Sequence, residues 1–116
     1  MNRYVEFDDN NSELHILNGT ESTIKYEDIE KVSVLNEDAS FKGKGTPFVH
    51  QVLGGTTFYS MFGEPGLYVG LKITLKDGSI KAIYVSEKKC YVNTDMYKKD
   101  REIAQKIKNK IDKRII

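Results

Sequence analysis

The side chains best suited to catalysis or metal binding are few in this chain and lie far apart in the sequence. There are two histidines, His15 and His50, and one cysteine, Cys90. Metal sites normally combine several ligands at short spacing, and a cysteine nucleophile needs a histidine near it. Lys88 and Lys89 precede Cys90, and their charges would lower the pKa of its thiol. We predict no catalytic residue, no metal centre and no cofactor.

Two further patterns suggest chemistry but have simpler explanations. Residues 43–46 (GKGT) contain a Gly-Lys pair, but a phosphate-binding loop needs Ser or Thr directly after the lysine and a glycine five residues before the pair, where Asp38 stands. We interpret this segment as a flexible basic turn. Acidic residues such as Asp8, Asp9, Glu27 and Asp28 fall where turns are predicted, so solvation explains them better than acid–base catalysis does.

Bulk composition is typical of one globular domain. The chain has 116 residues, 39% hydrophobic and 30% charged, so we expect a single domain over residues 1–116. One cysteine allows no internal disulfide and suits a reducing compartment. Residues 1–11 are too polar for a secretory signal, and no stretch has the apolar length of a membrane span. We expect a cytoplasmic protein, with peripheral contact as its one route to a membrane.

The net charge of +1 hides an asymmetry along the chain. Residues 1–40 hold ten acidic and three basic residues, whereas residues 94–116 hold four acidic and eight basic ones. Solvated faces explain such runs more often than partners do. No nucleic-acid-binding motif is present and the basic residues surround a helix that must also pack, so we expect no nucleic-acid partner.

Short strands are predicted almost throughout the first 92 residues. Residues 3–8 and 13–18 flank a turn of Asp and Asn residues, and further strands are expected at 22–25 and 29–35. Residues 67–86 predict a hairpin with Asp77-Gly78 as a two-residue turn. That turn would place Leu71 opposite Tyr84 and Ile73 opposite Ala82, with Ile83 and Val85 on the other face.

A long amphipathic helix is predicted at about 94–114. Asn, Thr and Asp at positions 93–95 are suitable capping residues. Apolar residues recur at three- and four-residue spacing, which predicts a buried stripe. The stripe is formed by Met96, Ile103, Ala104, Ile107, Ile111 and Ile115.

Residues 41–66 differ in composition from the rest of the chain. They hold six of nine glycines, both prolines and four of five phenylalanines, with strands expected around 48–53 and 57–61. An aromatic patch beside positive charge would suit a peptide, a lipid surface or another subunit. The alternative is that alternate aromatic residues, Phe48 included, belong to the core. The candidate contact surface is Phe41, Lys42, Lys44, Phe58, Tyr59, Met61 and Phe62.

Three stretches resemble small bacterial pleckstrin-homology-like (PH-like) domains: residues 24–32 (IKYEDIEKV), the hairpin at 71–80 and the helix at 104–111. The resemblance implies a bent antiparallel sheet or partly open barrel, seven-stranded in that family, capped by a C-terminal helix. It implies a binding or scaffolding module with no catalytic residues. Members that bind phosphoinositides have a basic first hairpin loop. Here residues 8–11 are acidic, which argues against that ligand at the usual site.

The leading hypothesis is therefore a mostly β, non-enzymatic interaction module that binds a protein, a peptide or a membrane surface. A homo-oligomeric structural domain is the alternative, because exposed sheet edges can pair. A second alternative is a role like that of bacteriocin-immunity envelope proteins. An enzyme is the least favoured interpretation, since it would need His50, Cys90 and a carboxylate together in one pocket.

Overall fold

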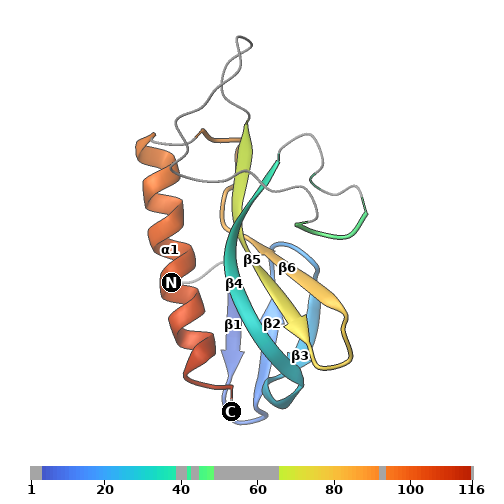
Figure 1. The fold of residues 1–116 in the computed structure, drawn as a ribbon. Coiled ribbons are helices and arrows are strands. Elements are labelled where there is room, and N and C mark those ends of the chain that lie inside the picture. Colours follow the sequence, from blue (N-terminus) through green and yellow to red (C-terminus); the bar gives the residue numbers. More distant parts are fainter. Residues whose placement is uncertain (1–3, 39–41, 43–44, 49–65, 92–93, 116) are drawn as a thin grey trace.

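The computed structural model describes residues 4–38, 42, 45–48, 66–91 and 94–115, and its elements follow the predicted order (Figure 1). In the described residues, six strands precede one helix, with a short 3₁₀ turn, η1 (Tyr26–Asp28), between β3 and β4. The strands are β1 (Val5–Asp8), β2 (Glu13–Ile16), β3 (Ser22–Lys25), β4 (Ile29–Asp38), β5 (Leu67–Leu75) and β6 (Ile80–Tyr84). The helix is α1 (Asp95–Asp112). The expectation of a mostly β fold with one C-terminal helix is confirmed.

The strands form two antiparallel sheets of three, with the orders β1-β2-β3 and β4-β5-β6. Within the described residues the two sheets do not close into a barrel. The loop after β2 joins them at the edge of β6, where the Thr20 N–H donates to the Ala82 carbonyl at 2.8 Å. Gly19 has a φ of +137° there, and a Cβ on it would lie 2.0 Å from that carbonyl oxygen. Only glycine fits this junction.

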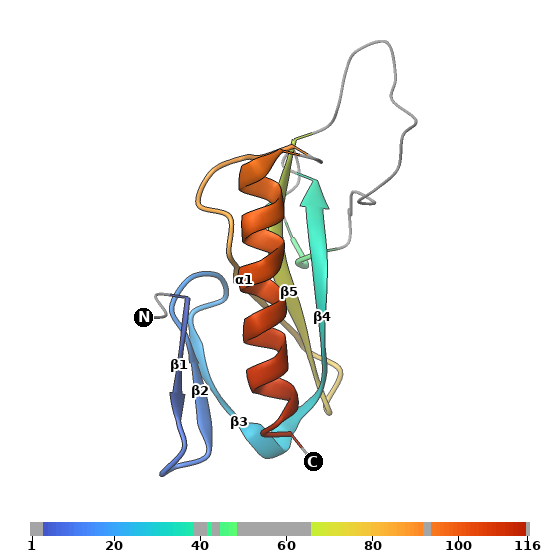
Figure 2. The ribbon, with the colours of Figure 1, turned by 90° about the vertical axis from the view of Figure 1, so that its left-hand side faces the viewer.

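Helix α1 begins where the sequence predicts, because the Thr94 side chain caps it by accepting from the Tyr97 N–H at 3.2 Å. It packs against β4 and β5, and the β1–β2 hairpin lies beside it (Figure 2). Ala104, Ile107 and Ile111 form the buried stripe. Met96 was expected there but is 44% exposed. Tyr97 is buried instead, since it lies seven residues before Ala104 on the same side of the helix.

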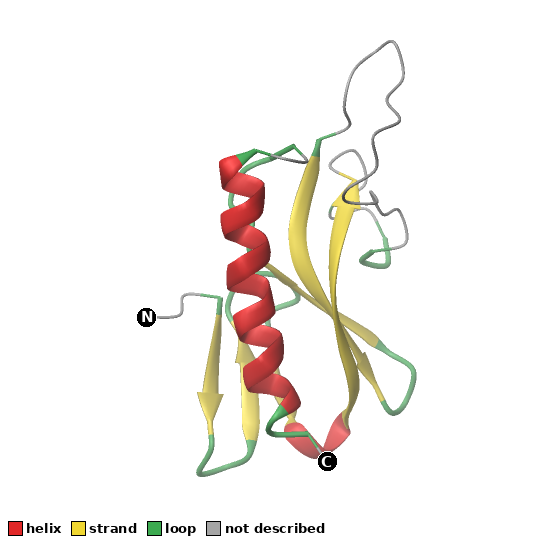
Figure 3. Cartoon of the chain, turned by 60° about the vertical axis from the view of Figure 1, so that its left-hand side comes forward, coloured by secondary structure: helices red, strands yellow, loops and turns green. Residues whose placement is uncertain are grey.

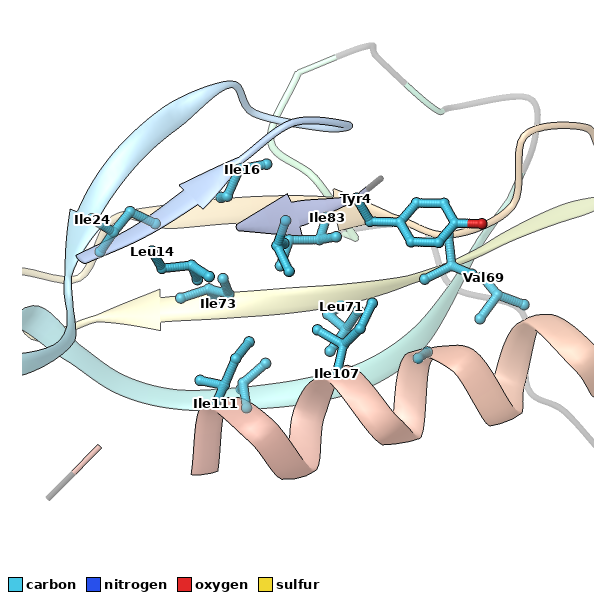
Figure 4. Close-up of a cluster of buried hydrophobic side chains, with 14 of the residues drawn as sticks. Tyr4, Leu14, Ile16, Ile24, Val69, Leu71, Ile73, Ile83, Ile107 and Ile111 are labelled. Carbon is cyan, nitrogen blue, oxygen red and sulfur yellow. The ribbon is translucent and has the colours of Figure 1, made fainter. Parts of the chain in front are cut away.

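The core lies between the two sheets and the helix. Leu14, Ile16 and Ile24 approach from the first sheet, Ile107 and Ile111 from α1 (Figure 4). They meet on the inner face of the second sheet. That face is formed mainly by Val69, Leu71, Ile73 and Ile83, all fully buried. Strands thus cover part of this face and the helix covers the remainder (Figure 3).

The predicted register of the β5–β6 hairpin is wrong by one residue. Leu71 pairs with Ile83 and Gly70 with Tyr84. The Gly78 N–H donates to the Leu75 carbonyl, the Leu75 N–H donates to the Ser79 carbonyl, and Gly78 has a φ of +89°. This is a three-residue loop with a bulge rather than a two-residue turn. A one-residue shift exchanges the faces of a strand. In the second half of this hairpin, Ile83 and Val85 therefore face inward, while Ala82 and Tyr84 face outward.

Substituting Ile107 with Asp tests the docking of the helix. We expect a loss of about 3 kcal/mol or more in the free energy of unfolding, because an unpaired carboxylate would enter the core. Urea denaturation measures the change. Lys106→Asp, at the exposed neighbouring position, is the matched control and should cost far less. Equal stability of the two variants would contradict the docked helix.

Candidate functional site

Of the seven predicted contact residues, Lys42 alone lies within the described part of the chain. Phe41, Lys44, Phe58, Tyr59, Met61 and Phe62 lie outside the described residues, as do His50 and the strand expected at 57–61. Of the strand expected around 48–53, only Phe48 is described. The contact surface therefore remains a prediction. Of this predicted surface, the structure describes Lys42 and the side chains that contact it.

A buried carboxylate lies on the outer face of the second sheet, beside the segment that carries Lys42. Glu37 is 1% exposed, and its Oε2 accepts from the Phe48 backbone N–H at 2.7 Å. Its Oε1 accepts from the hydroxyl of Tyr84. Burial, and next the bond to Glu37, raises the pKa of Tyr84, which therefore stays protonated as the donor. Two donors thus satisfy a carboxylate that would otherwise be costly to bury.

Phe48 belongs to this outer-face anchor (Glu37, Phe48 and Tyr84) and not to an exposed patch. Phe48 is 1% exposed, and its ring stacks on Tyr84 with centroids 5.6 Å apart. Gly70 leaves space for the ring, because a Cβ there would lie 2.9 Å from the Phe48 Cζ. Phe48 has a φ of +63°, a left-handed conformation that phenylalanine rarely adopts. The anchor thus holds the chain at residue 48 against the sheet.

Lys42 lies across two tyrosine rings on the same face. Its Nζ is 4.8 Å from the centroid of Tyr68 and 4.7 Å from that of Tyr84. Both distances suit cation–π attraction. Lys42 is therefore positioned by the same tyrosine that donates to Glu37.

A surface hollow of about 370 Å³ opens beside Lys42. Leu17, directly after β2, lines it and is 42% exposed, one of three large hydrophobic residues that are exposed in the described part of the chain. Asn18, which also lines the hollow, is held by two hydrogen bonds to the backbone of Tyr84. Its carbonyl accepts from the Tyr84 N–H, and its side-chain Nδ2 donates to the Tyr84 carbonyl. The sequence analysis did not single out Leu17. The strand alternation predicts its exposure, since Leu14 and Ile16 point inward and the next residue, Leu17, points outward. The lining residues are Tyr4, Leu17, Asn18, Lys42, Ser86 and Glu87.

Cys90 is surrounded by packing contacts. It is 2% exposed, with its Sγ 3.6 Å from the Ser86 Oγ. Ser86 donates to Asp100 Oδ2 at 2.8 Å and accepts from the Val69 N–H. Burial raises the pKa of the thiol, so the expectation of a lowered value was wrong. The cause is that desolvation of the thiolate is the largest influence on Cys90.

A second polar group joins the end of the helix to the first hairpin. Arg114 donates to both carboxylate oxygens of Asp9, at 2.8 and 3.1 Å, and the Tyr26 hydroxyl donates to the same carboxylate at 2.7 Å. The guanidinium also lies 4.3 Å from the ring centroid of Phe7. Arg114, followed by Tyr26, lowers the pKa of Asp9 to about 2. We call Arg114, Asp9 and Tyr26 the Arg114 clasp.

The clasp borders a hollow of about 430 Å³ that Lys25, Lys76 and Arg114 line together with Glu27. Since Asp9 neutralises Arg114, two lysines and one carboxylate are left as charges around this hollow. The sequence argument against phosphoinositide at the first hairpin loop considered only that loop's acidic residues. Lys25 and Lys76 come from other elements and bring positive charge to the same hollow. The absence of a phosphoinositide site therefore remains a prediction.

His15 lies on β2 beside two carboxylates, a grouping that the sequence analysis did not predict. One potential metal-ligand atom from each of Asp8, Glu13 and His15 lies within 4.8 Å of the others. All three side chains are partly exposed. The antiparallel register creates this cluster, because it sets Asp8 opposite Glu13.

Comparison with known proteins assigns no family or function to this chain. No family model, no curated protein and no solved structure matches the chain. In the described residues, no helix has the length and apolar character needed to cross a bilayer.

The outer-face anchor can be tested with Glu37→Gln. The amide would present a donor to one of two groups that now donate, the Phe48 N–H or the Tyr84 hydroxyl. We expect a loss of about 1–3 kcal/mol in the free energy of unfolding, measured by chemical denaturation. Glu30→Gln on the exposed side of β4 is the control and should be near neutral. Equal effects would show that Glu37 does not anchor residue 48.

The Arg114 clasp predicts a pH dependence with a defined sign. The pKa of Asp9 is lower in the folded protein than the usual value near 3.8. Its contribution is therefore complete above about pH 4 and is lost as the pH falls through about 2. Thermal melting between those values should show a smaller loss of stability for Asp9→Asn than for the wild type. Glu27→Gln should keep the wild-type slope, and an unchanged slope in Asp9→Asn would count against the clasp.

Proposed function

We propose that this chain is a non-enzymatic interaction module with a PH-like fold, and that it binds a protein partner at the hollow between Leu17 and Lys42. The observation that carries the proposal is the pairing of an exposed leucine with a positioned lysine around that hollow. Exposed apolar side chains next to fixed polar groups are the usual components of a protein-binding surface.

The rigidity of the hollow supports this function. Leu17 and Asn18 both donate their backbone N–H groups to the Tyr4 carbonyl, at 2.8 and 3.2 Å. Lys42 is positioned by Tyr68 and Tyr84. A surface whose side chains are already ordered loses less conformational entropy when a partner binds.

The partner that fits is a protein segment presenting an apolar side chain to Leu17. Lys42 would favour a carboxylate or backbone carbonyl next to that side chain. The predicted contact residues at 41–66 would extend the same surface, because Lys42 belongs to both. The order of strands followed by a helix agrees with the proposed PH-like class, whose members are commonly binding modules.

The double variant Leu17→Ser with Lys42→Ala tests this surface. Proteins retained from a native lysate by the immobilised wild-type chain are identified by mass spectrometry, and each candidate is then purified and titrated. We expect the double variant to lose about tenfold or more in affinity. Met96→Ser, at an exposed apolar position on the helix, is the matched control and should bind as the wild type does.

Two further measurements test whether the hollow binds a second copy of the chain or a lipid surface in place of a protein partner. A second copy of the chain would appear as a dimer in light scattering that the double variant removes. A lipid surface would appear as cosedimentation with anionic vesicles. Unchanged affinity of the double variant for every purified candidate would overturn the proposed surface. Phe58→Ser with Phe62→Ser tests the predicted contact residues separately, and it should weaken binding while leaving the melting temperature near the wild-type value.

A further inference from the structure

The exposed face of the first sheet gathers potential metal ligands that lie apart in the sequence. Asp8 ends β1 and Glu13 begins β2, and the register sets them directly opposite each other. His15 follows Glu13 by two residues, so its side chain points to the same face. All three therefore project from the outer side of one hairpin, away from the buried Leu14 and Ile16.

Their donor atoms are close enough for one ion to reach. The Nε2 of His15 is 3.9 Å from Glu13 Oε1, and one donor atom from each of the three residues lies within 4.8 Å of the other two. Ligands held at about 2.1 Å around a tetrahedral ion lie about 3.4 Å apart. All three residues are partly exposed, and side-chain rotation is needed to shorten these separations. At Asp8 an ion competes with Asn11, which donates to the carboxylate from its backbone N–H at 3.2 Å and from its side-chain Nδ2 at 2.8 Å.

A residue outside the cluster orients the imidazole. Thr23 is the register partner of His15 on β3, and its Oγ1 lies 3.0 Å from His15 Nδ1. This contact leaves Nε2, the other ring nitrogen, facing Glu13. Histidine ligands in metal sites commonly have their second nitrogen fixed by a hydrogen bond in this way, which sets both the tautomer and the ring orientation.

We propose that Asp8, Glu13 and His15 form a binding site for a divalent transition-metal ion of the zinc class. One imidazole nitrogen and two carboxylate oxygens are a donor set that suits such ions, whereas Mg²⁺ and Ca²⁺ prefer oxygen ligands alone. Three protein ligands leave a further position for water or for a group supplied by a partner.

The surrounding charges are compatible with a cation. Glu6 and Asp9 also line the hollow of about 580 Å³ next to the cluster, as do Lys110 and Arg114. Arg114 is already paired with Asp9. Lys25 is the register partner of Glu13, but the two side chains form no ion pair in the described part of the chain.

Titration of the metal-free full chain with zinc chloride tests the site. Calorimetry gives the stoichiometry, and amide chemical shifts show which residues respond. We expect one ion per chain, with shifts centred on the β1–β2 hairpin. Since a ligand is removed, His15→Ala and Glu13→Gln should each weaken binding about tenfold or more, and Thr23→Val should weaken it about 10–100-fold. His50→Ala and Glu30→Gln are the matched controls and should retain wild-type affinity.

Each contrary outcome is distinct. No heat and no shifts up to about 1 mM zinc would overturn the proposal, because a site of this kind binds more tightly than that. Binding that survives His15→Ala, or that is lost in His50→Ala, would place the ion elsewhere and overturn it as well. Circular dichroism confirms folding of every variant. If His15→Ala does not fold, Glu13→Gln decides the question, and full retention of affinity in that variant counts against the site.

Discussion

The inner face of β5 is covered from two directions, and this double coverage unites the two sheets and the helix. Leu71 and Ile73 meet apolar side chains of the first sheet on one side and the isoleucines of α1 on the other. The helix packs against β4 and β5, and the apolar side chains of the first sheet cover the remainder of the face. The polar contacts at the periphery, the Arg114 clasp among them, keep the first sheet and the helix in position. They contribute less to the stability of the fold than the apolar burial in the core does.

The outer face of the same sheet is arranged differently. Among the described residues its apolar cluster consists of Phe48, Ala82 and Tyr84 with flanking Leu35 and Tyr68, and the buried carboxylate of Glu37 lies beside them. Hydrogen bonds to a charged acceptor are directional, so they specify where residue 48 lies more strictly than apolar contact would. The proposed contact surface adjoins this face because Lys42 shares Tyr84 with the anchor. The anchor and the proposed contact surface thus have one tyrosine in common.

The elements themselves could be predicted from the sequence because their signals are local. The Thr94 cap and the spacing of Ala104, Ile107 and Ile111 are enough to predict α1. The register of the β5–β6 hairpin was mistaken, because Asp77-Gly78 fits both a two-residue turn and the second and third positions of a bulged loop. The left-handed backbone of Phe48 depends on Glu37 and Gly70, which other segments supply. The grouping of His15 with Asp8 and Glu13 was within reach, since pairing the predicted strands 3–8 and 13–18 across their turn brings these residues together.

Burial of the chain's one thiol has a practical consequence. Cys90 lies under contacts from β5 and from Ser86, and its thiol is shielded and protonated in the folded protein. A thiol-directed reagent can reach it only when this region opens, so the rate of its alkylation under native conditions reports local opening events. The protein therefore carries an intrinsic probe of its own fluctuations next to the helix, and no engineered label is needed to follow them.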